Sequence, residues 1–105
     1  MDELESAIHH LLKARELLEN GGDCKVELWF ARSKIEVFLA KLSLKHGLEE
    51  VATPRIKGKV NLNLEVVDEL VKELGSAAES YCSGDFEGAF KTGWNVREKL
   101  TKLLL

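Results

Sequence analysis

The fold that we expect is decided by two similar stretches, GDCKVELWFARSKIEVFL at residues 22–39 and GDFEGAFKTGWNVREKLTKLLL at residues 84–105. In each, a Gly-Asp turn signal precedes apolar residues at helical spacing. Four residue positions recur at the same offsets, as Trp29, Arg32, Lys34 and Ile35 in the first stretch and Trp94, Arg97, Lys99 and Leu100 in the second. The distance from turn to Trp differs between the two stretches, so both a duplicated hairpin and a chance similarity stay open.

Helical periodicity extends outward from both stretches and predicts helices over residues 2–19, about 24–46, 64 to about 81, and 86 to the C-terminus. Short glycine-containing turns join the first helix to the second and the third to the fourth, which makes each pair an antiparallel hairpin. Asp23 is the expected cap of the second helix, and Asn61 or Asn63 that of the third.

The two hairpins span about residues 2–46 and 64–105, and residues 47–63, with Gly47, Pro54 and Gly58, form a linker between them. A chain of 105 residues has the usual size of one domain. The predicted fold is therefore a single all-α domain over residues 1–105, an up-down-up-down four-helix bundle made of two helical hairpins.

Composition narrows the function classes. With 45% hydrophobic and 31% charged residues, the chain has the profile of a soluble globular protein. A net charge of −3 argues against a surface that wraps nucleic acid all round. The sequence shows no apolar run long enough to span a membrane and no basic, then apolar N-terminal segment, so we expect a cytoplasmic location. Absent Gln and scarce Met favour a thermophilic source.

The second predicted helix is apolar on more than one face. One stripe contains Leu28, Ala31, Ile35, Phe38 and Leu42, and another contains Val26, Phe30, Val37, Ala40 and Leu44. A second apolar face is usually covered, either by a second subunit or by burial of the helix at the centre of one bundle. We therefore predict a homodimer through this helix, with the central helix as the alternative.

The repeated Trp and Arg have two interpretations. Residues three apart share a helix face, so each Arg can cover its own indole at the edge of the core. Alternatively, Arg32 and Arg97 face a shared groove beside Trp29 and Trp94 and hold a phosphate or carboxylate. These four residues are candidate binding residues.

The linker has an uneven charge. Arg55, Lys57 and Lys59 surround Gly58, and the segment 51–63 contains no acidic residue. Alternate spacing in an extended segment places all three cations on one side, where they can contact phosphates. Exposed cations of this kind are also ordinary solvated surface, so the cluster is a candidate nucleic-acid contact and no more.

The sequence offers no pattern for catalysis, a metal or a cofactor. His9 and His10 diverge on a helix and cannot chelate one ion as an i, i+4 pair can. Cys24 and Cys82 are too few for a structural zinc site and have no base beside them in sequence. In the predicted topology the two cysteines are drawn towards one end of the bundle, so a disulfide and two free thiols both stay open.

The first hairpin resembles that of the HEPN superfamily of small helical bundles. The resemblance is carried by residues 7–18 and by the helix ELWFARSKIEVFLAKLSLKHG, in which Ala31, Glu36, Lys41 and Gly47 match the small residue, the Glu and the Lys-rich end before Gly. It implies a four-helix bundle, often dimeric, in a superfamily that contains ribonucleases and binding partners of nucleotidyltransferases. The nucleolytic members carry an Arg four to six residues before a His, and no histidine of this chain has one.

The sequence thus favours a non-catalytic binding or scaffold domain, HEPN-like, with a nucleotide, RNA or protein partner. The alternative is an enzyme whose catalytic groups are scattered along the chain beyond recognition. A pocket lined by titratable groups with shifted pKa values would favour the enzyme, whereas a broad apolar patch would favour the interaction module.

Overall fold

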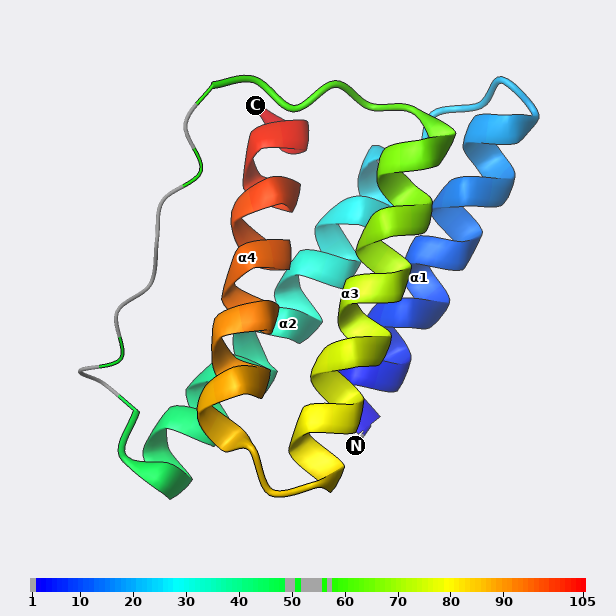
Figure 1. The fold of residues 1–105 in the computed structure, drawn as a ribbon. Helices are drawn as coiled ribbons and strands as arrows, with labels where there is room; N and C mark the ends of the chain where they lie inside the picture. Colours follow the sequence, from blue (N-terminus) through cyan, green and yellow to red (C-terminus); the bar gives the residue numbers. More distant parts are fainter. Residues whose placement is uncertain (1, 49–50, 52–55, 57) are drawn as a thin grey trace.

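A computed structural model describes residues 2–48, 51, 56 and 58–105 of the chain, and the described part contains four helices. They are α1 (Asp2–Glu19), α2 (Lys25–His46), α3 (Leu64–Cys82) and α4 (Phe86–Leu104), arranged as two hairpins (Figure 1). The predicted all-α class and the four-helix bundle made of two helical hairpins are confirmed.

The residues that begin and end the helices lie largely where the sequence predicts them. The side chain of Asn63 accepts a hydrogen bond from the backbone N–H of Val66 at 2.8 Å and caps α3. Asp23 accepts from the backbone N–H of Lys25 at 3.0 Å, although α2 itself begins after Cys24, one residue later than predicted. Gly47 closes α2 in the left-handed conformation at φ 64°, which glycine adopts without strain.

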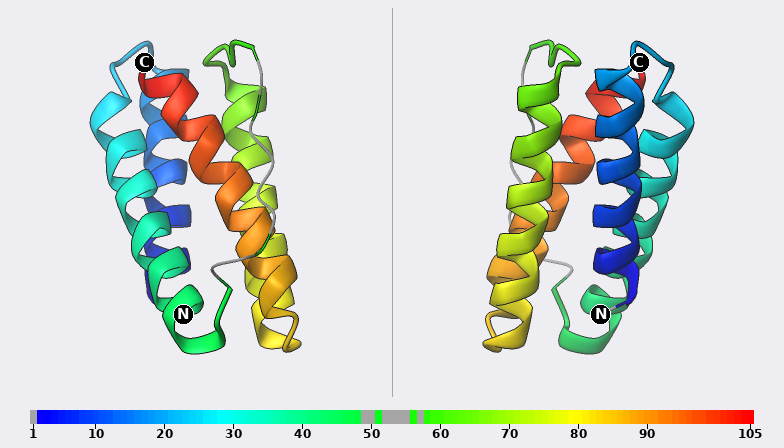
Figure 2. Two further views of the ribbon diagram at one scale, coloured as in Figure 1. Left: turned by 90° about the vertical axis from the view of Figure 1, so that its left-hand side faces the viewer. Right: turned by 90° about the vertical axis from the view of Figure 1, so that its right-hand side faces the viewer.

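Each helix has two helix neighbours. α1 packs against α2 and α3, and α4 packs against the same two helices from the other side. α2 and α3 therefore lie diagonally across the bundle, as do α1 and α4 (Figure 1, Figure 2). An ion pair between Arg15, near the end of α1, and Asp68, near the start of α3, shows that these two neighbours are antiparallel.

The direction of the second hairpin corrects the up-down-up-down order. α2 and α3 run the same way, so the order is up, down, down, up (Figure 1). The linker 47–63 leaves α2 at one end of the bundle and meets α3 at the other. A short connection forces neighbouring helices to be antiparallel, whereas a long crossover permits either direction, so periodicity alone does not determine the order.

This topology also decides the question of the cysteines. The turn between α1 and α2 and the turn between α3 and α4 lie at opposite ends of the bundle (Figure 1). Cys24 follows the first turn and Cys82 precedes the second, so the expectation that both approach one end is wrong. Both cysteines are free, Cys24 buried and Cys82 exposed.

The spacing of the buried core residues is the same in the two hairpins. Fully buried residues with 0% exposure recur at identical spacing along the first helix of each hairpin, as Leu4, Ala7, Leu11 and Ala14 in α1 and Val67, Leu70, Leu74 and Ala77 in α3. In the second helices, Ala31 and Ile35 of α2 match Val96 and Leu100 of α4, again with 0% exposure. The repeat seen in the sequence is therefore also a repeat of structure.

Candidate functional site

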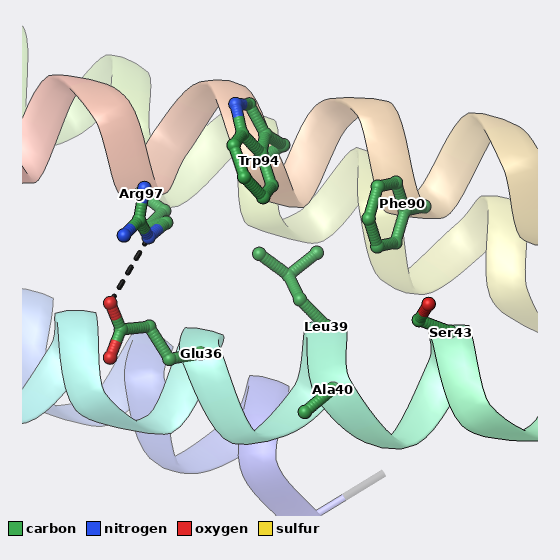
Figure 3. Close-up of a pocket in the computed structure, with 7 residues that line it drawn as sticks. All are labelled: Glu36, Leu39, Ala40, Ser43, Phe90, Trp94 and Arg97. Carbon is green, nitrogen blue, oxygen red and sulfur yellow. Dashed lines mark hydrogen bonds and ion pairs between the residues drawn. The ribbon is translucent and has the colours of Figure 1, made fainter. Parts of the chain in front are cut away.

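A groove of about 300 Å³ opens between α2 and α4 (Figure 3). α2 contributes one wall and α4 the other, with Glu36, Leu39, Ala40 and Ser43 on the first and Phe90, Trp94 and Arg97 on the second. Its middle is apolar and aromatic, and its charged groups gather at one end, where Glu36 meets Arg97 (Figure 3).

Small residues explain the shape of this groove. Gly93 lets the two helices approach closely, because a Cβ atom there would lie 3.1 Å from Cδ2 of Leu39 and 3.5 Å from a ring carbon of Phe38. Beside this contact, Ser43 faces Phe90 and is too short to fill the space between the two helices (Figure 3). The indole of Trp94 is thus left partly accessible, whereas Phe90 is only 6% exposed.

The polar end of the groove brings two predicted binding residues together. Nε of Arg97 donates a hydrogen bond to Oε1 of Glu36 at 3.1 Å, and Nη2 of Arg32 lies 3.1 Å from the same oxygen. Arg32 also donates from Nε to the Thr101 hydroxyl at 2.8 Å. The two arginines do face each other between α2 and α4, and the carboxylate that they hold belongs to Glu36 of this chain.

These contacts follow the internal repeat. Arg97 is the counterpart of Arg32, and Thr101 of α4 is the counterpart of Glu36 of α2. Each arginine therefore reaches from its own helix to the matching position on the other, from Arg32 to Thr101 and from Arg97 to Glu36. The sequence interpretation missed both acceptors as site residues, because a Glu and a Thr at matching positions of the repeat do not resemble each other.

The repeated tryptophans differ in exposure. Cζ of Arg97 lies 5.0 Å from the ring centroid of Trp94, a cation–π distance, and Phe90 stacks on the same indole at 6.0 Å. Trp29 instead is 54% exposed and touches the ring of Phe30 edge-on at 5.5 Å. The prediction of an arginine-covered indole thus describes Trp94, whereas Trp29 offers most of its ring to solvent.

Of the predicted linker cluster, Lys59 is described and is exposed. It borders a hollow together with Lys102 and Leu103 of α4. Arg55 and Lys57 lie outside the described residues, so a phosphate contact by the three cations stays a prediction.

The outer face of α2 carries a second surface. Val26, Phe30, Ser33, Val37, Ala40 and Leu44, here called the outer stripe, alternate at spacings of four and three residues, the spacing of a coiled-coil seam. Its large members are exposed, by 65% for Val26, 40% for Phe30, 43% for Val37 and 83% for Leu44. α2 lies at the side of the bundle (Figure 2), so within the described residues the stripe faces outward.

In the part of the chain that the structure describes, Glu3, Arg15 and Cys24 have shifted pKa values and lie away from the groove. A hydrogen bond from Lys41 lowers the pKa of Glu3, and a hydrogen bond to Asp68 raises that of Arg15. Burial, assisted by the nearby charge of Asp23, raises the pKa of the Cys24 thiol. Glu3 and Arg15 belong to exposed or partly exposed ion pairs between helices, and Cys24 belongs to the core.

Among the described residues, no cluster of three or more His, Cys, Asp or Glu side chains is arranged to hold a metal ion. None of the four helices in the described part of the chain combines the length and the apolar character needed to cross a bilayer. Comparison with known proteins found no matching family model, no matching curated protein and no matching solved structure.

Proposed function

We propose that this chain is a non-catalytic binding module that works as a homodimer joined through the outer stripe of α2. The observation that carries the proposal is the exposure of four large apolar side chains in one coiled-coil seam. Contiguous exposed apolar surface of this kind marks interaction sites in monomeric folds.

The second half of the molecule supports this proposal as an internal comparison. At the positions of α4 that match Val26, Phe30, Ser33 and Val37, the chain carries Lys91, Asn95, Glu98 and Lys102. The bundle therefore tolerates polar side chains at this place in the repeat. Phe30 stacks on His10 of α1 at 5.2 Å, but the other large apolar residues of the stripe are not required at this place in the repeat, which favours a role in binding.

The groove between α2 and α4 is also better suited to an interaction module than to an enzyme. Its volume of about 300 Å³ is at the lower limit of the roughly 300–1,000 Å³ typical of small-molecule sites. Its two arginines are engaged by Glu36 and Thr101. We include in the proposal a HEPN-like relationship and a nucleic-acid or protein partner for the dimer, for which the exposed Lys59 is one contact point.

Sedimentation velocity across a wide concentration range tests the dimer. The wild-type chain is expected to sediment as a dimer, and the variant Phe30→Glu/Val37→Glu as a folded monomer with unchanged helical circular dichroism. Leu12→Glu is the matched control, because Leu12 is 49% exposed but lies on α1, and it should leave the dimer intact. A wild-type monomer at the highest concentration would refute the proposal.

A further inference from the structure

The outer stripe has a size pattern that distinguishes two ways of pairing with a second copy. Along the seam, one position of each heptad holds the large residues Phe30, Val37 and Leu44, and the other holds Val26 and the small residues Ser33 and Ala40. In a parallel pair of α2 helices, each residue of the outer stripe lies opposite the same residue of the second copy. Phe30 would then lie against Phe30 of the second copy, and Ser33 against Ser33. Layers with too much side-chain volume would alternate along the seam with layers with too little.

An antiparallel pair removes this mismatch. Centred on the stripe, it places Phe30 against Ala40 of the second copy, Val37 against Ser33, and Val26 against Leu44. Two of the three kinds of layer then combine a large residue with a small one, and the outermost kind combines a valine with a leucine. Such alternation gives even packing along a seam, so the stripe is self-complementary in the antiparallel direction.

One pair of charged residues beside the seam agrees with this direction. On the side of α1, Glu27, which contacts His10 of its own chain, comes opposite Lys41 of the second copy, which pairs with Glu3 of its own chain. The side chain of Lys41 is 68% exposed, so its charge can also attract Glu27 across the seam. Lys34 lies next to the two-fold axis, where its flexible stem can turn its charge into solvent.

On the side of α4, the same register sets Trp29 opposite Ser43 of the second copy. Ser43 belongs to the α2 wall of the groove, together with Ala40, and faces Phe90 (Figure 3). The exposed indole of Trp29 on one copy thus lies opposite the α2–α4 groove of the other copy, and this groove has room for one side chain. The two-fold symmetry produces this contact twice.

Resting on the proposed homodimer, we infer that two copies pair their α2 helices antiparallel and that Trp29 of each copy inserts into the α2–α4 groove of the other. Each groove is then completed by the second copy. Tryptophan anchors in desolvated pockets dominate many interfaces. Trp29 occupies the position in the repeat that Trp94 holds at the edge of the core of its own chain. In the dimer, Trp29 instead anchors one copy to the other.

Disulfide trapping tests the direction, in a Cys82→Ser background that leaves the buried Cys24 in place. Under mild oxidation, Val26→Cys mixed with Leu44→Cys should give a mixed disulfide, and Val26→Cys alone should give none. A dimer in which Val26→Cys cross-links to itself would overturn the antiparallel pairing while leaving the proposed homodimer standing. A chain that is monomeric at all concentrations would overturn both.

The anchor has its own test. Trp29→Ala should raise the dimer dissociation constant at least tenfold, and Ser43→Arg, which obstructs the groove from its α2 wall, should have a similar effect. In the wild-type chain, tryptophan emission should shift to the blue as the dimer forms, because Trp29 leaves the solvent. A dimer that forms with unchanged affinity in Trp29→Ala and with no shift in emission would refute the anchor and leave the homodimer in place.

Discussion

Cys24 combines a buried position with a reactive group. The side chain is 2% exposed, and burial raises the pKa of its thiol, whereas Cys82 at the end of α3 is exposed. Because the thiolate is the species that reacts, we predict that a disulfide reagent at pH 8 labels Cys82 rapidly and Cys24 only when the protein opens. Mass spectrometry of quenched samples measures the two rates. Equal rates in the native protein would contradict this assignment.

The same thiol makes stability depend on pH in a definite direction. Its pKa is higher in the folded chain than in the unfolded chain, so the unfolded state loses the proton first as pH rises. The contribution of Cys24 is complete below the unfolded pKa, about 8.5, and declines above it. In a Cys82→Ser background, urea unfolding should show this decline, and Cys24→Ala should lessen it despite a lower overall stability.

Glu36 shows what the sequence does not reveal at the scale of single residues. It is one of 18 acidic residues, and its neighbours in sequence do not distinguish it. Its position between Arg32 and Arg97 depends on how α4 crosses α2, which only the packed bundle determines. The arginines and tryptophans were identifiable because they repeat. Their acceptors were not, because a Glu and a Thr at matching positions do not look alike.

At the scale of the helix, two glycines have opposite roles. Gly75 lies within α3, where an added Cβ atom would meet nothing within 4 Å, whereas Gly93 of α4 packs against Leu39. We predict that Gly75→Ala stabilises the protein by about 0.5–1 kcal/mol through helix propensity. Gly93→Val should destabilise it by about 1–3 kcal/mol through overpacking. Denaturant titration measures both values, and a stabilised Gly93→Val would show that the helices can separate at no cost.

Helix bounds and hairpins were predictable because periodicity, glycine turns and caps such as Asn63 are local signals. The two faces of α2 were predictable as well, since both stripes can be counted in the sequence. The direction of α3 was not, because a long linker carries no signal for it. The groove also required the structure, since Ser43 and Phe90 come from different hairpins and meet only where α2 and α4 diverge from their contact at Gly93.

At the scale of the whole molecule, the length of the linker 47–63 is what permits this topology. The 19 residues of α3 span roughly 28 Å at 1.5 Å per residue, and the linker has to cover about this length to reach the start of α3. A linker of about four residues extends to at most about 14 Å. It cannot connect α2 to α3 within one copy of this bundle.

We therefore predict that replacing residues 47–63 by Gly-Ser-Gly-Ser prevents the monomeric fold and drives exchange of hairpins between chains. The replacement is made in the Phe30→Glu/Val37→Glu background, so that dimerisation through the outer stripe does not interfere. Light scattering after gel filtration should show a dimer or larger species that retains its helical content, whereas a flexible linker of the original length should give a monomer. A stable monomer with the short linker would mean that α3 can reverse its direction. The contacts between α1 and α3, including the Arg15–Asp68 ion pair, would then not determine the directions of the helices.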